Sequence, residues 1–312
     1  MNQITILTPT LNRARELEKA MNSVVEAGLP KYEHIIIDGD SKDDTSEIIK
    51  HFPNITFISE PDNGLYEALN KGLLIAKGEY IGWINSDDAF KPNALYPLLQ
   101  ILETDLNIMA VFASAEIDFG IKNMPYVLIP SIKKEEILHR VTLDSVSMNA
   151  CLFRKSVFDR IGLFNTTYKV VSDRDFLFRF GLSGMAYSSV DQVIYTYIAH
   201  PDSLTFADRY IGNENANLEE MRMAHEHFCS SVSLDIRNIC IKWHSRASAN
   251  AAIIFIDKKK YHQAVLTARQ GFHIDLAWLT YFLKQETLHL IRKYVPALMR
   301  RKFNRFRRYL SN

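Results

Sequence analysis

Cysteine is scarce in this sequence and is not arranged as a disulfide framework or a thiolate metal site. Cys151, Cys229 and Cys240 are the three cysteines among 312 residues, and no two of them form a CxxC pair. An odd number of widely spaced cysteines is typical of proteins in a reducing compartment. We interpret them as small buried residues and expect a cytoplasmic protein.

Long hydrophobic runs and an excess of charge are also lacking. The longest apolar runs, such as 249–256, are far shorter than the roughly 20 residues of a membrane-spanning helix. The first seven residues lead directly into a strand pattern, so we expect no signal peptide. A formal net charge of +1 offers no overall argument for nucleic acid binding, and we expect no nucleic acid partner.

The N-terminal half alternates strand and helix patterns, whereas the last third is helical. Repeated units of one strand and one helix predict an α/β fold with a mostly parallel sheet between helices. We interpret the irregular stretch 119–147 as a wall or flap of the active site, and residues beyond 203 as helices. The predicted strands are 4–7, 34–37, 55–58, 80–84, 109–113 and 192–199; the predicted helices are 15–27, 45–52, 65–76, 154–164, 173–182 and one beginning near Pro92.

Acidic turns follow three of the predicted strands. NSDD stands at 85–88, DGDS at 38–41 and DNG at 62–64. Carboxyl ends of parallel strands gather at one edge of a sheet, where ligands of such folds bind. Oxygen ligands suit Mg²⁺ or Mn²⁺, which often keep substrate phosphates in their coordination shell. An acidic turn alone can be a helix cap, but three converging turns predict a site for a metal-bound diphosphate.

These turns belong to a longer series of motifs in a fixed order. The motifs are LTPTLNR at 7–13, IDGDSKDDT at 37–45, EPDNGLYEALNKG at 60–72, AKGEY at 76–80 and NSDD at 85–88. The series resembles the family 2 glycosyltransferases of the GT-A fold, most of all the branch that builds bacterial surface polysaccharides such as colanic acid, capsule or O-antigen. The resemblance covers roughly residues 3–200, and several ordered motifs are more specific than one alone.

The resemblance implies a nucleotide-diphospho-sugar transferase fold with a C-terminal helical extension. Residues 1–204 would form the catalytic domain, with a nucleotide-sugar half at 1–115 and an acceptor half at 116–204. Residues 205–312 would form a helical region that ends in a basic amphipathic tail. From Lys284 onward the chain has nine Lys or Arg and one acidic residue, Glu286, interleaved with apolar residues. Such a segment, 284–310, suits anionic lipid headgroups; the alternatives are a helix packed on the catalytic domain and a dimer surface.

The resemblance also assigns roles to residues of the donor site. The first loop would edge the nucleotide base, an aspartate of the second would bind the base or ribose, and the third would line the nucleoside side. An asparagine and a lysine of the following helix would lie near the diphosphate or sugar, although that lysine could equally be a solvated helix residue. These donor-binding residues are Thr8, Pro9, Thr10, Asn12, Arg13, Asp38 or Asp40, Asp62, Asn70, Lys71, Asn85 and Asp87.

The chemical step would use a metal ion and a base. The resemblance implies that Asp87 and Asp88 hold Mn²⁺ or Mg²⁺ against the phosphates, which stabilises the leaving group. Asp173 occupies the place of the family's general base, which takes the proton of the acceptor hydroxyl; a helix N-cap is the alternative. For Asp175 we expect a structural role. Asn149 stands where many members of the family have His, so any role of a His there is lost or changed.

We therefore expect an inverting glycosyltransferase that moves a hexosyl or N-acetylhexosaminyl group from a UDP- or GDP-sugar to a glycan or polyprenyl-diphosphate-linked acceptor. A location at the inner face of the cell membrane would suit such an acceptor. A nucleotidyltransferase would normally show a glycine-rich basic loop after the first strand, and residues 8–13 contain no glycine. A non-catalytic scaffold of a membrane complex would predict loss of Asp87, Asp88 or Asp173, and all three are present.

Overall fold

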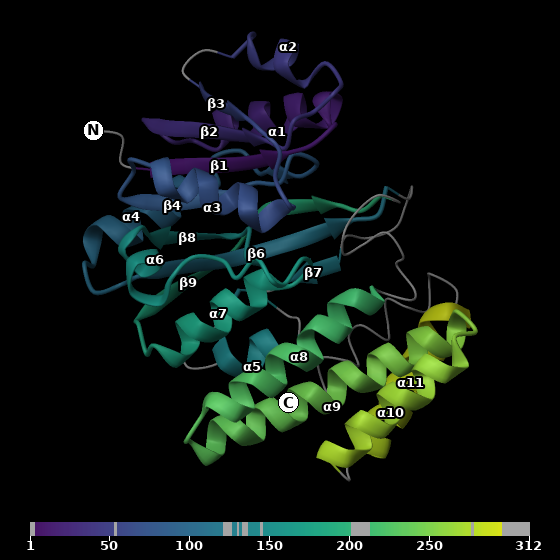
Figure 1. Cartoon of the computed structure of the whole chain (residues 1–312). Coiled ribbons are helices and arrows are strands. Elements are labelled where there is room, and N and C mark those ends of the chain that lie inside the picture. The colour runs from purple at the N-terminus through teal and green to yellow at the C-terminus, as the bar shows by residue number, and fades with distance from the viewer. Residues whose placement is uncertain are drawn as a thin grey trace. The chain divides into compact units, whose positions relative to one another are not determined.

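The computed structural model describes residues 4–52, 55–120, 127–129, 131–132, 137–143, 146–200, 213–275 and 278–294. They form two compact units. The first contains the described residues up to Ile198, and the second contains those from Ala199 onward. The first unit contains a sheet with helices around it, and the second is helical (Figure 1). The domain boundary predicted at residue 204 lies outside the described residues.

The first unit is built on one sheet with the strand order β3-β2-β1-β4-β8-β6-β9-β5, and β7 pairs with β6. β1 is parallel to β2 and β4, and β2 is parallel to β3, as the repeated strand–helix pattern predicts. Beyond β4 the sheet is mixed, because β8 runs antiparallel to both of its neighbours. The strands are β1 (Ile4–Thr10), β2 (Tyr32–Asp38), β3 (Ile55–Ser59), β4 (Tyr80–Trp83), β5 (Ala89–Phe90), β6 (Ala110–Asp118), β7 (Val127–Ile129), β8 (Cys151–Arg154) and β9 (Tyr187–Ile198).

Helices cover both faces of this sheet. Successive residues of a strand point to opposite faces; Ile36 of β2 packs in a cluster with α1, whereas Ile37 faces α3. A Cβ atom at Gly72 of α3 would lie 2.8 Å from the Ile37 side chain, so glycine allows this close approach. The helices are α1 (Ala14–Glu26), α2 (Thr45–Ile49), α3 (Leu65–Ile75), α4 (Tyr96–Thr104), α5 (Ile137–Thr142), α6 (Ser156–Ile161) and α7 (Ser172–Leu182).

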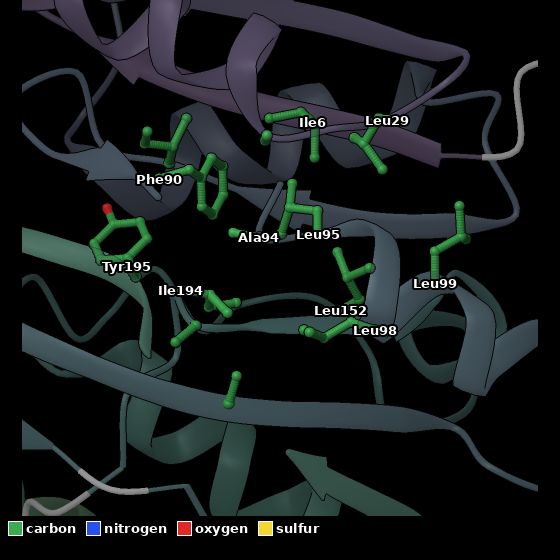
Figure 2. Packing of buried hydrophobic residues seen from close by; sticks show 14 of the residues in the cluster. Ile6, Leu29, Phe90, Ala94, Leu95, Leu98, Leu99, Leu152, Ile194 and Tyr195 are labelled. Carbon is green, nitrogen blue, oxygen red and sulfur yellow. The ribbon is translucent and has the colours of Figure 1, made fainter. Parts of the chain in front are cut away.

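The two faces have cores of different composition. On the α1 and α4 face the core is mainly aliphatic and includes Ile6, Leu95 and Leu152 (Figure 2). On the opposite face the core is aromatic, with Phe112 and Phe153 in T-shaped contact at 5.7 Å between ring centroids. Well-packed cores on both faces fix the strand ends from which the loops of the site emerge.

The predicted helix start near Pro92 is wrong, because α4 begins at Tyr96. The residues after the acidic turn first form β5, which pairs with β9. Asn93 then adopts a φ of 55°, a left-handed conformation that a helix cannot include. The helix predicted at 154–164 begins at Ser156, because β8 ends at Arg154, and the stretch 119–147 contains β7 and α5.

The second unit consists of helices, as predicted for the C-terminal region. Small residues of α9, Ala247 and Ala251, pack with Met221 of α8 and Ala264 of α10, which brings these helices close together. Within the described residues no helix is long and apolar enough to cross a membrane. Residues 295–312, most of the predicted basic tail, lie outside the described residues. The helices are α8 (Glu214–Ser230), α9 (Leu234–Asp257), α10 (Tyr261–Ile274) and α11 (Trp278–Tyr294).

Candidate active site

Three loops meet at the carboxyl ends of β1, β2 and β4. Because these strands are adjacent and parallel, their following loops emerge at the same edge of the sheet. The Asn12 backbone N–H donates to Ser41 Oγ at 2.7 Å, and the Lys42 N–H donates to Asn12 Oδ1 at 2.8 Å. Arg13 forms an ion pair with Asp87 at 3.4 Å. Asn12 thus joins the first loop to the second, and Arg13 joins it to the acidic turn.

The two aspartates of the second loop have different environments. Asp38 is 2% exposed and accepts hydrogen bonds from the Ser59 hydroxyl at 2.7 Å and from the Ser41 backbone N–H and hydroxyl. Asp40 has a φ of 70°, is 44% exposed at its side chain and pairs with Lys42 at 2.7 Å. Asp38 therefore shapes the loop from inside, while Asp40 is the carboxylate that a nucleoside could contact.

The other residues predicted to line the nucleoside also differ in position, because some lie within the sheet and one lies beside the second loop. Thr8 is fully buried, and its hydroxyl is hydrogen-bonded to His34 Nε2 at 2.9 Å, within the sheet rather than in the loop. Pro9 and Thr10 follow it in β1, and the buried Thr10 hydroxyl has no hydrogen-bond partner among the described residues. Asp62 accepts from the Gly64 N–H at 2.8 Å, and a Cβ at Gly39 would lie 3.0 Å from its Oδ2. Asp62 therefore lies against the second loop.

Asn70 and Lys71, predicted to lie near the diphosphate or sugar, make structural contacts. Asn70 exchanges two hydrogen bonds with the backbone of Phe164, at 2.9 and 3.0 Å. The Lys71 ammonium lies 2.9 Å from a Glu60 carboxylate oxygen and donates to the Pro61 carbonyl at 2.9 Å. Both side chains thus connect α3 to neighbouring segments.

Asp88 is buried at the end of the acidic turn and accepts three hydrogen bonds. Tyr195 Oη and Asn85 Nδ2 donate to Oδ2 at 2.7 and 2.9 Å, and the Ile198 N–H donates to Oδ1 at 2.9 Å. Burial, together with the charge of Asp87, raises the pKa of Asp88 to about 7, while these hydrogen bonds favour its charged form. Asp87 is more accessible, with 18% of its side chain exposed.

The acidic turn can supply a divalent metal with one accessible carboxylate. No cluster of three or more His, Cys, Asp or Glu side chains suited to a metal ion occurs in the described part of the chain. Mg²⁺ commonly uses one or two protein carboxylates and takes its other ligands from water and substrate phosphates. The accessible Asp87 fits that requirement, whereas three of the roughly four lone-pair positions of the Asp88 carboxylate are already occupied.

Asp173 lies in the first turn of α7, where its carboxylate contacts a buried tyrosine. The Tyr66 hydroxyl lies 3.0 Å from Asp173 Oδ1 and 3.0 Å from the Val170 carbonyl oxygen. The N-cap alternative for Asp173 is wrong, because Val171 occupies the cap position. Asp175 forms an ion pair with Arg179 at 2.8 Å inside the helix.

A series of side-chain contacts runs from Asp173 toward the strand that precedes the acidic turn. Tyr66, whose hydroxyl contacts Asp173, packs against Phe164 with 5.6 Å between ring centroids. Phe164 in turn contacts Trp83 of β4 edge to face, with 5.7 Å between ring centroids. Trp83 lies two residues before Asn85, the first residue of the acidic turn.

Several residues of the site were missed in the sequence. Tyr195, Trp83 and Tyr66 make the hydrogen bonds that hold the acidic turn and Asp173. Aromatic residues in predicted strands and helices are usually core residues, and these three are indeed buried. The available signal was weak: the residues Tyr195 and Tyr197 alternate near the end of a strand that leads into the site.

Residues 5–162 match the family model described as Glycosyl transferase family 2, so the chain belongs to that family. One curated relative is an uncharacterized glycosyltransferase from Haemophilus influenzae, which is 27% identical over 179 residues. The match covers 56% of this chain and 61% of that protein, so the chain spans about three fifths of the relative's length.

Two solved structures have the same overall fold. TarS from S. aureus in complex with UDP has a TM-score of 0.60 and 14% identity, covering 92% of each chain. The mannosyltransferase PcManGT from Pyrobaculum calidifontis, in complex with GDP-Man and Mn²⁺, has a TM-score of 0.59 and 17% identity, covering 95% of this chain and 87% of that one. These comparisons confirm the predicted family and the GT-A fold.

The different environments of Asp38 and Asp40 predict different effects of substitution. Asp38→Ala should lower the free energy of unfolding by about 1–2 kcal/mol, because it removes the acceptor of three hydrogen bonds that hold the loop. Asp40→Asn removes an exposed ion pair, keeps a side chain that tolerates the positive φ, and should change that free energy by less than about 0.5 kcal/mol. Urea denaturation followed by tryptophan fluorescence and by far-UV circular dichroism measures both. Equal effects of the two substitutions would contradict this assignment.

Proposed function

We propose that this protein transfers a sugar from a UDP- or GDP-sugar to a hydroxyl group of an acceptor, with inversion at the anomeric carbon. The observation that carries the proposal is the joining of three loops at one edge of the sheet, where Arg13 pairs with the accessible Asp87 and Asn12 is hydrogen-bonded to the loop that exposes Asp40. Membership of glycosyl transferase family 2 supports the reaction class. Residues 1–204 are the catalytic domain in this proposal, with its nucleotide-sugar half at 1–115 and its acceptor half at 116–204.

The nucleotide would bind across the loops that follow β1, β2 and β3. TarS binds UDP and PcManGT binds GDP-Man with Mn²⁺, which supports a nucleoside diphosphate as the common part of the donor. Asp40 and Asp62 are suited to accept hydrogen bonds from the base or ribose. The Thr10 hydroxyl, which has no hydrogen-bond partner within the described residues, is suited to bond the base edge. Asp38, Thr8, Asn12 and Asn70 then serve to keep these loops in place.

Mn²⁺ or Mg²⁺ would be held by Asp87 and would neutralise the charge that develops on the departing nucleoside diphosphate. Arg13, paired with Asp87 at 3.4 Å, is placed to keep that carboxylate in position and to lie near the phosphates. Asp88 contributes by fixing the turn. The predicted pair of metal ligands, Asp87 and Asp88, thus becomes one ligand and one supporting carboxylate in this proposal.

Asp173 would act as the general base. As the acceptor oxygen forms its bond to the anomeric carbon, the bond from that carbon to the phosphate oxygen breaks, and the hydroxyl proton moves to Asp173. Attack from the face opposite the leaving group inverts the configuration. The contact between the Tyr66 hydroxyl and Asp173 Oδ1 at 3.0 Å supports a fixed orientation of the carboxylate.

The acceptor in this proposal is a glycan or a polyprenyl-diphosphate-linked sugar of surface polysaccharide synthesis, used at the inner face of the membrane. The nine Lys and Arg from Lys284 onward support contact with an anionic lipid surface. A nucleotidyltransferase is disfavoured by the absence of glycine from residues 8–13, and a scaffold by the presence of Asp87 and Asp173.

Asp173→Asn tests the proposed chemistry. The amide keeps the shape of the side chain and an oxygen for Tyr66 but is not a base, so kcat for transfer should fall by about 10²–10⁴. The dissociation constant of the donor in the presence of Mn²⁺ should stay unchanged. Asp159→Asn, an exposed acid in the first turn of α6, is the matched control and should retain full activity. Full transfer activity of Asp173→Asn with a panel of UDP- and GDP-sugars would exclude Asp173 as the base.

Removal of residues 295–312 tests the membrane contact. This segment contains six Lys or Arg, each worth about 1 kcal/mol near an anionic surface. Co-sedimentation with vesicles that contain anionic phospholipid should therefore fall by more than about tenfold on truncation. Both the full chain and the truncated chain should bind weakly to vesicles of neutral phospholipid. Unchanged binding to anionic vesicles would contradict the proposed contact, and a change of oligomeric state alone would favour a dimer surface.

A further inference from the structure

A buried chain of hydrogen bonds connects three parts of the first unit and ends on Asp88. Trp83 Nε1 donates to Asn149 Oδ1 at 2.9 Å, Asn149 Nδ2 donates to Tyr195 Oη at 2.8 Å, and Tyr195 Oη donates to Asp88 Oδ2 at 2.7 Å. All four side chains are at most 8% exposed. We call Trp83, Asn149 and Tyr195 the buried relay.

The chemistry of these groups fixes the direction of every hydrogen bond in the relay. An indole N–H can only donate, so Asn149 must accept with its carbonyl oxygen and present its NH₂ group to Tyr195. Tyr195 Oη receives this bond and a second one from the Asn85 backbone N–H at 3.2 Å. Its one proton is therefore directed to Asp88. The Tyr195 hydroxyl has no remaining hydrogen-bonding position for any other partner.

Packing prevents the relay from relaxing to another arrangement. The ring of Tyr195 belongs to the aliphatic core and contacts Phe90 edge to face at 5.4 Å between centroids (Figure 2). Phe90 is in β5, two residues after Asp88, and it pairs in register with Tyr195 of β9. The Ile198 N–H of the same strand donates to the second oxygen of Asp88. The carboxylate of Asp88 is thus held at both oxygens by β9.

We propose that Tyr195 and Asn149 are positioning residues of the metal site. By holding Asp88, the relay fixes the backbone of the acidic turn and with it the direction in which the adjacent Asp87 presents its carboxylate. This inference rests on the proposed function, in which Asp87 is the protein's ligand to Mn²⁺ or Mg²⁺. Groups that orient a metal ligand from outside the coordination shell commonly change metal affinity by about 10–100-fold.

Tyr195→Phe removes only the hydroxyl and tests this role. In the full-length protein, the dissociation constant for Mn²⁺, titrated at saturating UDP and at saturating GDP, should rise about 10–100-fold. The affinity for the nucleotide without metal should change by less than about twofold, since the hydrogen bonds of the relay in the described part of the chain go to the acidic turn and not to the loops of β1 and β2. Excess Mn²⁺ should restore most of kcat, which a general loss of folded protein would not allow.

Asn149→Ala breaks the relay one step earlier and should weaken Mn²⁺ binding in the same direction. The double variant Tyr195→Phe/Asn149→Ala should lose less affinity than the product of the two single effects, because both substitutions interrupt one chain of hydrogen bonds.

Tyr80→Phe is the matched control. Tyr80 is a buried tyrosine of β4, and its hydroxyl accepts a hydrogen bond from Arg154 at 3.3 Å, so this substitution should leave the Mn²⁺ dissociation constant unchanged. An unchanged constant in Tyr195→Phe, or an equal increase in Tyr80→Phe, would overturn the positioning role while the proposed function stands. If the wild-type protein fails to bind Mn²⁺ both in the presence of UDP and in the presence of GDP, both proposals are overturned.

Discussion

A carboxylate that is removed from water must have its oxygens occupied by donors, and the candidate site is organised around this requirement. Asp88 meets it with donors from its own turn and from β9, and Asp38 meets it with donors from its own loop and from β3. Because each buried carboxylate has partners on two separate segments, it fixes the distance between those segments. The loops at this edge of the sheet are therefore held by charge and hydrogen bonding as much as by apolar packing.

Each of the two acidic loops contains one buried and one accessible aspartate. Asp38 is buried while Asp40 is accessible, and Asp88 is buried while Asp87 is accessible. The buried residue of each pair contributes to the shape of the loop, and the accessible one can reach a ligand. This division explains why the chain has more acidic residues at these turns than a nucleotide and one metal ion need for direct contact.

Much of the fold could be predicted from the sequence because its signals are local. The alternation of strand and helix identified β1 to β4 and α1 to α3, and the acidic turns that follow parallel strands had to meet at one edge. The antiparallel insertion of β8 and the start of α4 depend on pairings between distant segments, such as β5 with β9, which no local pattern encodes.

The candidate site was predicted less completely for the same reason. The motifs identified which loops contribute, but not which aspartate in each loop is buried. That distinction depends on Ser59 for Asp38 and on Tyr195 and Ile198 for Asp88, residues that lie 21 or more positions away in sequence. The resemblance likewise implied that Asn70 and Lys71 lie near the diphosphate or sugar, yet their partners are the Phe164 backbone and Glu60.

The most direct test is a crystal structure of the full chain with Mn²⁺ and either UDP or GDP, with the metal located by its anomalous scattering. The account predicts Mn²⁺ bound by an Asp87 oxygen and by the diphosphate, with Asp88 still hydrogen-bonded to Tyr195 and Ile198. Manganese bound by Asp88 after loss of those hydrogen bonds, or a nucleotide bound away from the loops of β1, β2 and β4, would contradict it.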